Sequence, residues 1–483
     1  MTATAVDDGA AAAPSEQESS SSHDEGRAER RRVLLRTFWL PFVVIALLGL
    51  GIRLAVIQAA PTCADDQAVE DGCFPVDTDT TEYIVVAQLL ADGEGYTFIT
   101  DESLTLADTA HHPPAFSTYL AAWSLAGVDG FTGFRRAGAL LGLVTMVLVA
   151  DIGRRLGGRA VGLVAGLLVA VHPALWLNDV TLLSESIYQP LAAFVVWSGY
   201  RLWCRRTLGS AALLGAACGL AALSRTEGAL LGAMVAVPLA IGMVELRRRD
   251  RLGLVLATGA TSLLVVAPWI HLNSVRFDKP VLMTSTAGQS LFLTNQPETY
   301  YGHLLGSKSG YAHLIVVDAR AEALGLDESQ IDRRLSSDAA QYTSGNEGRL
   351  PTVVLTRVAR MWGLYKPAQM AQADYASEGR LLWPSRASWW VHGAVLPLAV
   401  AGLVLLWRRG LPVSPLAALL FASSATSAIN FGLTRYRAGA DVALCVLAAV
   451  ALVALARWLG RLRERSGHPP GPDPERPLAE ARV

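Results

Sequence analysis

The chain has 483 residues, of which 52% are hydrophobic and 17% are charged, and its mean hydropathy is positive. This composition excludes an ordinary soluble enzyme and indicates a polytopic membrane protein. The formal net charge of −1 gives no sign of a nucleic-acid partner, and we expect none.

The first 32 residues are rich in Ala, Ser, Glu and Asp without periodicity, and we expect a disordered cytoplasmic tail. After this tail, ten apolar stretches are long enough, or nearly so, to cross a bilayer. They are residues 33–58, 134–152, 160–176, 183–203, 209–224, 228–245, 252–271, 389–407, 413–431 and 438–459. A further apolar segment, Ala115–Gly127, has about 13 residues, which suits a re-entrant or interfacial helix better than a crossing.

Arginines are concentrated at every second connection between these stretches. Because short cytoplasmic loops collect Lys and Arg, this alternation predicts that both termini are cytoplasmic. The remaining connections are then extracytoplasmic: residues 59–133, 177–182, 225–227, 272–388 and 432–437. The predicted fold is an all-α polytopic membrane protein with about ten transmembrane helices, one re-entrant or interfacial helix and an extracytoplasmic domain.

The chain therefore divides into five predicted parts. These are a cytoplasmic tail (1–32), a transmembrane core (33–271) that carries the first extracytoplasmic loop (59–133), an extracytoplasmic domain (272–388), C-terminal transmembrane helices (389–460) and a second tail (461–483). Cys63 and Cys73 lie in the first outer loop, in an oxidising compartment, and we predict a disulfide between them. Arg53 lies in the outer third of the first apolar stretch, where it either pairs with a loop carboxylate or extends to the interface.

Residues 76–96 form the most informative loop segment. Tyr83 and two later apolar residues share one face of a predicted short helix, and Asp79 lies one turn before Tyr83 on that face. Asp77 is a second carboxylate just ahead of this helix. Two interpretations remain open for Asp79: it is an N-cap, with Glu82 completing a capping box, or it is a functional acid that points into the protein or the membrane boundary.

A tandem histidine pair, His111 and His112, follows this segment and directly precedes a Pro-initiated short helix. The two side chains are either solvated loop residues or ligands of phosphate or metal. Two adjacent histidines without a spaced third ligand are a weak zinc signal.

Arginines on the predicted outer side are informative because the charge rule disfavours them there. Arg225 lies two residues before Glu227, and the two form either a local salt bridge or part of an anion clamp. Arg435 and Arg437 lie between the last two apolar stretches, and Glu185 opens the fourth, where it suits the positive end of a helix dipole. Carboxylates beside arginines at one interface suit a reaction on a lipid-linked phosphate, because Arg binds phosphate bidentately and keeps its charge.

Several motifs in a fixed order carry a resemblance to a known family. They are Asp79-x-x-x-Tyr83, Gly93-Glu94-Gly95-Tyr96, His112-Pro113-Pro114, Leu183-Ser184-Glu185, Ser224-Arg225-Thr226-Glu227-Gly228 and Arg435-Tyr436-Arg437. Over residues 33–459 the chain resembles bacterial polyprenyl-phosphate-sugar glycosyltransferases of the GT-C superfamily, which are related to protein O-mannosyltransferases and to the lipid A aminoarabinose transferase. The chain departs from this family where Ala438–Asp441 follows the last motif in place of a frequent proline.

The resemblance implies a GT-C-like fold and a multi-pass enzyme of the cell membrane with its active site on the extracytoplasmic face. Such an enzyme moves a sugar from a polyprenyl-monophosphate donor, usually with inversion, to a protein, lipid or polysaccharide acceptor. Asp79 is the expected general base, with Asp77 as its neighbour or substitute. Burial is expected to raise the pKa of this carboxyl toward neutrality.

The resemblance also implies roles for other side chains. The residues expected to bind the donor phosphate are Arg225, Arg435 and Arg437, with His111 and His112 as helpers. The residues expected to support them are Glu185, Tyr83, Glu227 and Arg53. No cofactor is required, because arginines can hold a monophosphate, although the residues are compatible with a divalent metal.

Two other classes of protein share some of these features. A secondary transporter or lipid flippase also needs many spans and buried charges, but it usually shows interrupted helices and two matching halves, and the sequence shows no such repeat. A non-catalytic membrane scaffold or receptor tolerates a large outer domain but leaves the outer arginines unexplained.

Overall fold

The computed structural model describes Glu29 and residues 33–59, 78–99, 105–310, 326–377 and 380–465. The chain separates into two compact units, Met1–Val44 and Ile45–Val483. Asp77, Cys63 and Cys73 lie outside the described residues, so the role of Asp77 and the disulfide stay predictions.

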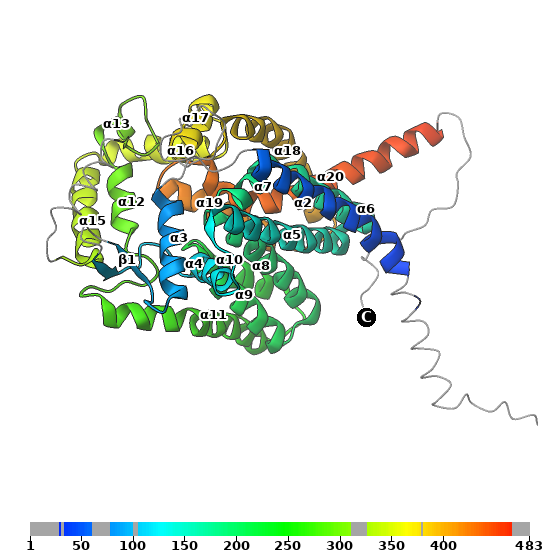
Figure 1. Cartoon of the computed structure of the whole chain (residues 1–483). Helices are drawn as coiled ribbons and strands as arrows, with labels where there is room; N and C mark the ends of the chain where they lie inside the picture. Colours follow the sequence, from blue (N-terminus) through cyan, green and yellow to red (C-terminus); the bar gives the residue numbers. More distant parts are fainter. Residues whose placement is uncertain are drawn as a thin grey trace, which may run out of the picture. The chain divides into compact units, whose positions relative to one another are not determined.

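Each of the ten predicted apolar stretches coincides with a helix or a pair of helices. These are η1 (Leu35–Trp39) with α2 (Leu40–Ala59), α5 (Gly130–Gly157), α6 (Arg159–Val171) with α7 (Pro173–Val180), α8 (Glu185–Arg205), α9 (Leu208–Ser224), α10 (Gly228–Gly242), α11 (Arg248–Arg276), α18 (Leu382–Arg408), α19 (Ser414–Ile429) and α20 (Ala438–Arg465). Figure 1 shows how the helices of the second unit pack beside one another.

By length and composition, five helices among the described residues can cross a membrane, or six if the bent pair α6 and α7 is one span. Helices α9, α10 and α19 are apolar but only 17, 15 and 16 residues long. At 1.5 Å per residue they are shorter than the roughly 30 Å hydrocarbon core. The count of about ten membrane spans therefore stays a prediction. The positions of the ten predicted stretches agree with the helices of the structure.

Small residues let several of these helices approach closely. α9 packs against α11, and α18 packs against α20. A Cβ at Gly215 would collide with the Thr258 backbone, and one at Gly402 would collide with the Leu447 backbone. Because glycine has no side chain, it allows the backbones of two membrane helices to pack directly against each other.

The first outer loop, which the sequence places between spans one and two, forms α3 (Thr78–Ala91), strands β1 (Thr97–Ile99) and β2 (Leu106–Asp108), and α4 (Ala115–Leu125). The strands pair antiparallel, with Phe98 opposite Ala107, so the all-α expectation missed one small hairpin. The predicted re-entrant or interfacial helix corresponds to α4, which packs on α3 through a buried cluster that includes Tyr83 and Phe116.

Residues 272–388, called the long connection here, contain six further helices within their described part. These are α12 (Ala287–Thr294), α13 (Pro297–Tyr300), α15 (Glu328–Ser344), η3 (Glu347–Arg349), α16 (Leu350–Met361) and α17 (Pro367–Ser377), followed by the start of α18. Arg357 is buried and donates to the backbone oxygens of Thr294, Ala428 and Ile429, at 2.8, 3.2 and 3.2 Å. This arginine therefore fixes the long connection to the end of α19.

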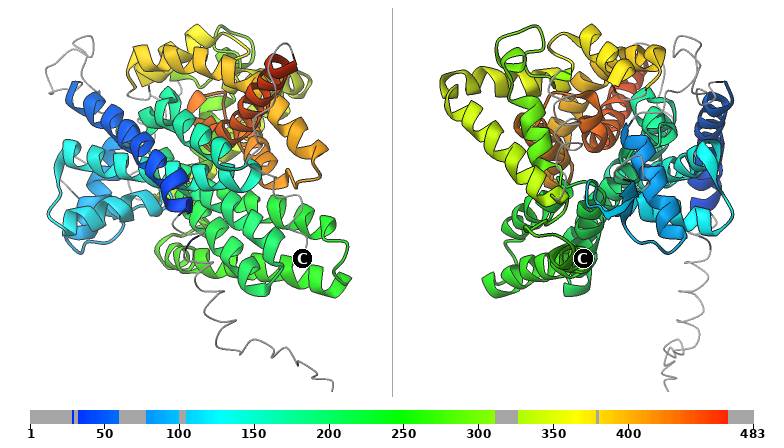
Figure 2. Two further views of the ribbon diagram at one scale, coloured as in Figure 1. Left: turned by 90° about the vertical axis from the view of Figure 1, so that its right-hand side faces the viewer. Right: turned by 60° about the vertical axis from the view of Figure 1, so that its left-hand side comes forward.

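Helix α3 and the long connection flank the region described next. In the right-hand view of Figure 2, the blue first-loop helices and the green to yellow helices of the long connection lie on opposite sides. The loop before α4 joins them, because Glu328 of α15 accepts hydrogen bonds from Thr109 Oγ1 and Ala110 N at 2.7 and 2.9 Å.

Candidate active site

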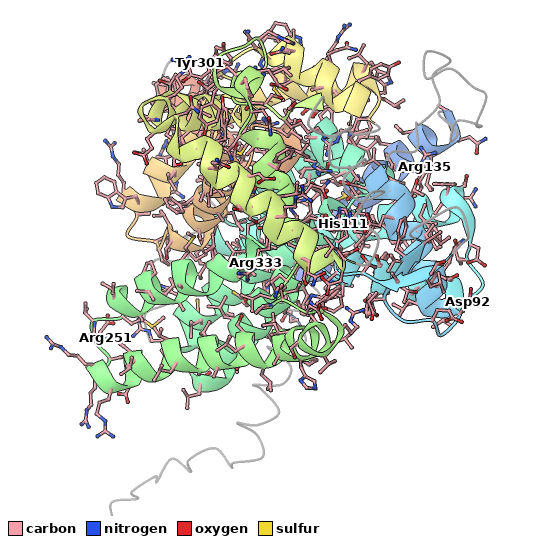
Figure 3. All side chains as sticks on the ribbon, turned by 90° about the vertical axis from the view of Figure 1, so that its left-hand side faces the viewer. Asp92, His111, Arg135, Arg251, Tyr301 and Arg333 are labelled. Atoms are coloured by element: carbon pink, nitrogen blue, oxygen red, sulfur yellow. The ribbon has the colours of Figure 1, made fainter. Side chains whose placement is uncertain are left out.

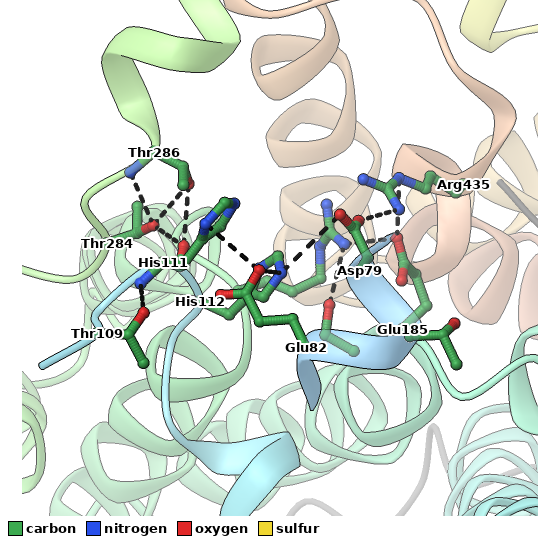
Figure 4. A network of polar contacts seen from close by, with 12 residues as sticks. Asp79, Glu82, Thr109, His111, His112, Glu185, Thr284, Thr286 and Arg435 are labelled. Atoms are coloured by element: carbon green, nitrogen blue, oxygen red, sulfur yellow. Dashed lines mark hydrogen bonds and ion pairs between the residues drawn. The ribbon is translucent and has the colours of Figure 1, made fainter. Parts of the chain in front are cut away.

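Ionisable side chains from three separate connections meet at one place. Helix α3 supplies Asp79 and Glu82, the loop before α4 supplies the two histidines, the start of α8 supplies Glu185, and the turn η4 (Thr434–Arg437) supplies Arg435. Figure 4 shows these groups facing one another, and Figure 3 shows His111 between the blue first-loop helices and the yellow-green long connection. The alternation of basic connections along the sequence predicts that these connections all lie on the extracytoplasmic side of the membrane.

Asp79 contacts Arg435 directly. Helix α3 starts at Thr78, so Asp79 is the second helical residue, within the first turn, and the N-cap interpretation is wrong. Its Oδ2 accepts a hydrogen bond from Arg435 Nη1 at 2.9 Å, and 26% of its side chain is exposed. The carboxylate is thus held by a cation while one part of it stays accessible.

Glu185 links two arginines behind Asp79. Its Oε1 accepts a hydrogen bond from Arg225 Nη1 at 2.5 Å and lies 3.7 Å from Arg435 Nε. Arg225 Nε also donates to Glu227 Oε1 at 2.6 Å, so two carboxylates share this one cation. Ser184, the N-cap of α8, makes no side-chain cap hydrogen bond. The contacts of Glu185 are therefore with the arginines, which a helix-dipole role alone does not explain.

The histidine pair lies on the other side of Asp79. His112 Nε2 is 3.9 Å from Asp79 Oδ1 and 3.7 Å from Glu82 Oε2, and His111 Nδ1 is 3.3 Å from Glu82 Oε2. The His112 ring stacks on Tyr83 with centroids 4.3 Å apart. Glu82 and both histidines line one small cavity.

The electrostatics of Asp79 differ from the sequence-based expectation. Burial acts to raise the pKa of this carboxyl, but Arg435 and then His112, Lys308 and His111 outweigh it and hold the pKa well below its ordinary value. The expected rise toward neutrality is therefore wrong for this state, because the sequence does not reveal a guanidinium 2.9 Å away. Burial also lowers the pKa of His112 to about 4, although Asp79 raises it, so this imidazole is neutral near pH 7.

Arg437 faces a different partner from Arg435. It is buried, and its Nε donates to Asp441 Oδ1 at 2.8 Å while its Nη1 donates to the Met361 oxygen at 3.1 Å. A 3₁₀ turn rotates about 120° per residue, so side chains two positions apart in η4 point in different directions. The predicted phosphate-binding role of Arg437 is therefore not supported by contact with the Asp79 group.

Arg53 also lies outside this group. It is fully buried, and its Nε donates to Asp179 Oδ2 at 2.7 Å while its Nη1 donates to the Gly49 oxygen at 3.0 Å. Neither alternative predicted for Arg53 is seen: it pairs with a carboxylate, but this one belongs to helix α7 and not to a loop. Arg53 therefore has a structural place in the helix bundle, and support of the site stays a prediction.

Sequence reasoning missed Lys308 and the backbone contacts that hold the histidine loop. Lys308, in the long connection, is close enough to Asp79 to favour its charged form. Thr286 Oγ1 donates to the His111 oxygen at 3.0 Å, and Thr284 Oγ1 donates to the same atom. No motif marks these residues, and only the folded long connection brings them to the loop.

Residues 111–271 match the model of the dolichyl-phosphate-mannose-protein mannosyltransferase family. Among solved structures, the archaeal oligosaccharyltransferase AglB from Archaeoglobus fulgidus, in complex with an inhibitory peptide and a dolichol-phosphate, aligns at 15% identity and a TM-score of 0.53 over 91% of this chain and 53% of that chain. An Archaeoglobus fulgidus oligosaccharyltransferase in complex with Zn and sulfate aligns at 15% identity and a TM-score of 0.50 over 88% of this chain and 50% of that chain.

ArnT from Cupriavidus metallidurans, bound to undecaprenyl phosphate, aligns over 89% of this chain and 81% of that chain at 15% identity, but its TM-score of 0.38 is too low to carry an argument. A search of curated proteins gives no match. The chain spans about half the length of the oligosaccharyltransferase chains that share its fold.

The predicted resemblance and the GT-C-like polytopic membrane fold are confirmed by the family match and the shared fold. The same findings support the prediction that the chain is a glycosyltransferase.

Proposed function

We propose that this protein moves a sugar from a polyprenyl-monophosphate carrier to an acceptor outside the cytoplasm, with inversion at the sugar. The observation that carries the proposal is the contact between a partly exposed carboxylate, Asp79, and Arg435 in a site assembled from connections predicted to lie on one side of the membrane. The family description, which names a mannosyltransferase that uses a dolichyl-phosphate-linked sugar, supports the donor class. The dolichol-phosphate bound to the structurally similar oligosaccharyltransferase agrees with it.

Asp79 is the general base in this proposal. Its carboxylate accepts the proton of the acceptor hydroxyl while that oxygen forms a bond to the anomeric carbon. The bond between the anomeric carbon and the phosphate oxygen breaks in the same displacement, so the configuration at that carbon inverts. The lipid phosphate leaves with the electron pair of that bond.

Arg435 is the proposed ligand of the departing phosphate. A guanidinium that binds Asp79 through one nitrogen still presents other N–H groups for a phosphate. As the phosphate takes up part of the charge of Arg435, the hold on Asp79 weakens and the carboxylate becomes a stronger base. Lys308 adds a second positive charge from the long connection.

Arg225 is a positioning residue in this scheme. Its Nε and Nη1 bind Glu227 and Glu185, and Glu185 in turn lies beside Arg435 Nε. Arg225 and Glu185 together thereby orient the guanidinium of Arg435. The reaction needs no metal, because cationic side chains can hold a monophosphate.

The site is proposed to face the extracytoplasmic side of the cell membrane. The charge alternation predicts that side for every connection that contributes to the site, and basic residues mark the other connections. Membrane lipid surrounds the apolar helices. The polyprenyl chain of the donor lies in this lipid, so the donor reaches the site from the membrane. The acceptor is a hydroxyl group of a protein, lipid or polysaccharide.

Donor turnover tests this reaction class. The full chain in lipid nanodiscs is incubated with radiolabelled polyprenyl-phosphate mannose or arabinose together with membrane extract as the source of acceptor. We expect label to move from the lipid into acceptor and free polyprenyl phosphate to accumulate. Unchanged donor with all such sugars, under conditions in which the protein stays folded, would overturn the proposal.

A further inference from the structure

We propose that Glu82, His111 and His112 form a binding site for a divalent cation, with zinc as the best fit. Their ligand atoms lie within 4.8 Å of one another, and the three residues line one cavity. The histidine pair in the sequence lacks a spaced third ligand. The structure supplies it from helix α3.

The separations suit ligands of one ion better than direct hydrogen bonds. Glu82 Oε2 lies 3.3 Å from His111 Nδ1 and 3.7 Å from His112 Nε2. A hydrogen bond between N and O is usually about 2.7–3.2 Å long. Two ligands at about 2.0–2.2 Å from a tetrahedral zinc ion are themselves roughly 3.3–3.6 Å apart. The two separations from Glu82 therefore match the spacing of ligands around one ion, and all three ligand atoms lie within 4.8 Å of one another.

The donor set selects the class of metal. Two imidazole nitrogens and one carboxylate oxygen form a ligand set that zinc uses when it keeps a fourth position open. Magnesium prefers six oxygen ligands, and calcium prefers six to eight. Asp79 Oδ1 lies 3.9 Å from His112 Nε2, so a further carboxylate stands beside the three ligands.

Contacts around the ligands hold them in place. The His112 ring is stacked on Tyr83, and the His111 carbonyl oxygen accepts hydrogen bonds from Thr284 and Thr286. Glu328 holds the two residues before the histidines through Thr109 Oγ1 and Ala110 N. Such fixed surroundings orient ligands before the metal arrives.

The charge of the surroundings also favours a cation. Glu82 places a carboxylate against the two histidines, and the carboxylate of Asp79 lies beside His112. A bound ion would place positive charge beside Asp79, where the donor phosphate is proposed to lie. That effect on the reaction rests on the proposed function, but binding of the ion does not.

Metal content measures the site independently of sugar transfer. The tag-free full chain in nanodiscs is stripped with a chelator, loaded with zinc chloride, freed of excess ion and analysed for zinc by mass spectrometry. We expect one zinc ion per chain. The retained zinc should fall to less than about a tenth in Glu82→Gln and in His111→Asn, because each removes a direct ligand.

Matched controls use exposed residues of the same types, Glu94→Gln and His271→Asn, which should retain the ion. Cobalt(II) provides a second readout on the wild type, since binding to nitrogen and oxygen ligands changes its visible absorption. Zinc should also raise the melting temperature of the wild type. Glu82→Gln should melt in one cooperative transition, which shows that the variant is folded, and zinc should leave its melting temperature unchanged.

Absence of retained zinc in the wild type, or equal zinc in Glu82→Gln, His111→Asn and the controls, would overturn the inference. Retained zinc in a chain that transfers no sugar supports the metal site and counts against the proposed reaction alone.

Discussion

Replacement of Arg435 by Gln removes the cation that contacts Asp79 and that is proposed to bind the donor phosphate. Arg435 lies 2.9 Å from Asp79 and 3.7 Å from Glu185, and 14% of its side chain is exposed. Unit charges about 3 Å apart attract by roughly 5 kcal/mol at an effective dielectric constant of about 20, before the cost of desolvation. Loss of one preorganised donor to a transition-state oxyanion typically lowers kcat by about 10²–10³-fold, or about 3–4 kcal/mol. We expect a loss of about 10²-fold, because solvent replaces part of the attraction at this partly exposed position.

The assay is release of polyprenyl phosphate in nanodiscs under saturating donor. Arg435→Lys keeps the charge but not the forked donor geometry, so it should recover about tenfold of the loss. Arg136→Gln removes an exposed arginine near the start of α5, for which the structure shows no place in the site, and should leave kcat unchanged. Folded Arg435→Gln protein with kcat within about threefold of the wild type would refute the reasoning.

Three further changes test other parts of the account. Glu185→Gln should lower kcat by about tenfold or more with a rise in KM, since Arg225 and Arg435 lose a shared partner, and normal kinetics would exclude a positioning role. Asp179→Asn leaves the buried Arg53 without its carboxylate and should destabilise the protein by about 3–5 kcal/mol, seen as a lower melting temperature in detergent, whereas an unchanged melting temperature would contradict a structural role. Asp327→Ala removes the N-cap of α15 and should cost about 1 kcal/mol near pH 7. Partial burial acts to raise the pKa of Asp327, but hydrogen bonds from Asp278, Ser329 and Gln330 lower it overall. The cap therefore stabilises the protein fully above about pH 4. The difference in melting temperature between the wild type and Asp327→Ala should shrink as the pH falls below that value.

The helices could be predicted from the sequence because long apolar runs have few alternatives in a membrane protein. Helices α11 and α18 extend beyond their predicted apolar stretches by several polar residues at their ends, since hydropathy detects the apolar part alone. Strands β1 and β2 were missed because each has only three residues, too few for an alternating pattern.

The central part of the site was also predictable, but the pairing within it was not. Motif order and charge alternation brought Asp79, Glu185, Arg225 and Arg435 to one side. The contact between Asp79 and Arg435 joins residues 356 positions apart, and no local pattern specifies it. Arg437 was grouped with Arg435 by its nearness in sequence, and the tight turn η4 separates the two side chains.

The third ligand of the proposed cation site shows the same limit. The sequence offers a capping box as one of two interpretations for Glu82, because Asp79 precedes it by three residues. In the structure, helix α3 begins before Asp79 and packs against the histidine loop, so Glu82 faces His111 and His112. Tertiary packing of α3 on α4 decides this orientation, and helix-capping preference does not.

The most direct test of the central claim is the single-turnover rate of sugar transfer from polyprenyl-phosphate donor by Asp79→Asn, compared with Asp92→Asn. Asp92 is an exposed carboxylate just after the same helix and serves as the matched control. If Asp79 accepts the proton of the acceptor hydroxyl, its variant should lose about 10²–10⁴-fold in rate while Asp92→Asn keeps the wild-type rate. Transfer by folded Asp79→Asn at the rate of Asp92→Asn would contradict the account and place the base elsewhere.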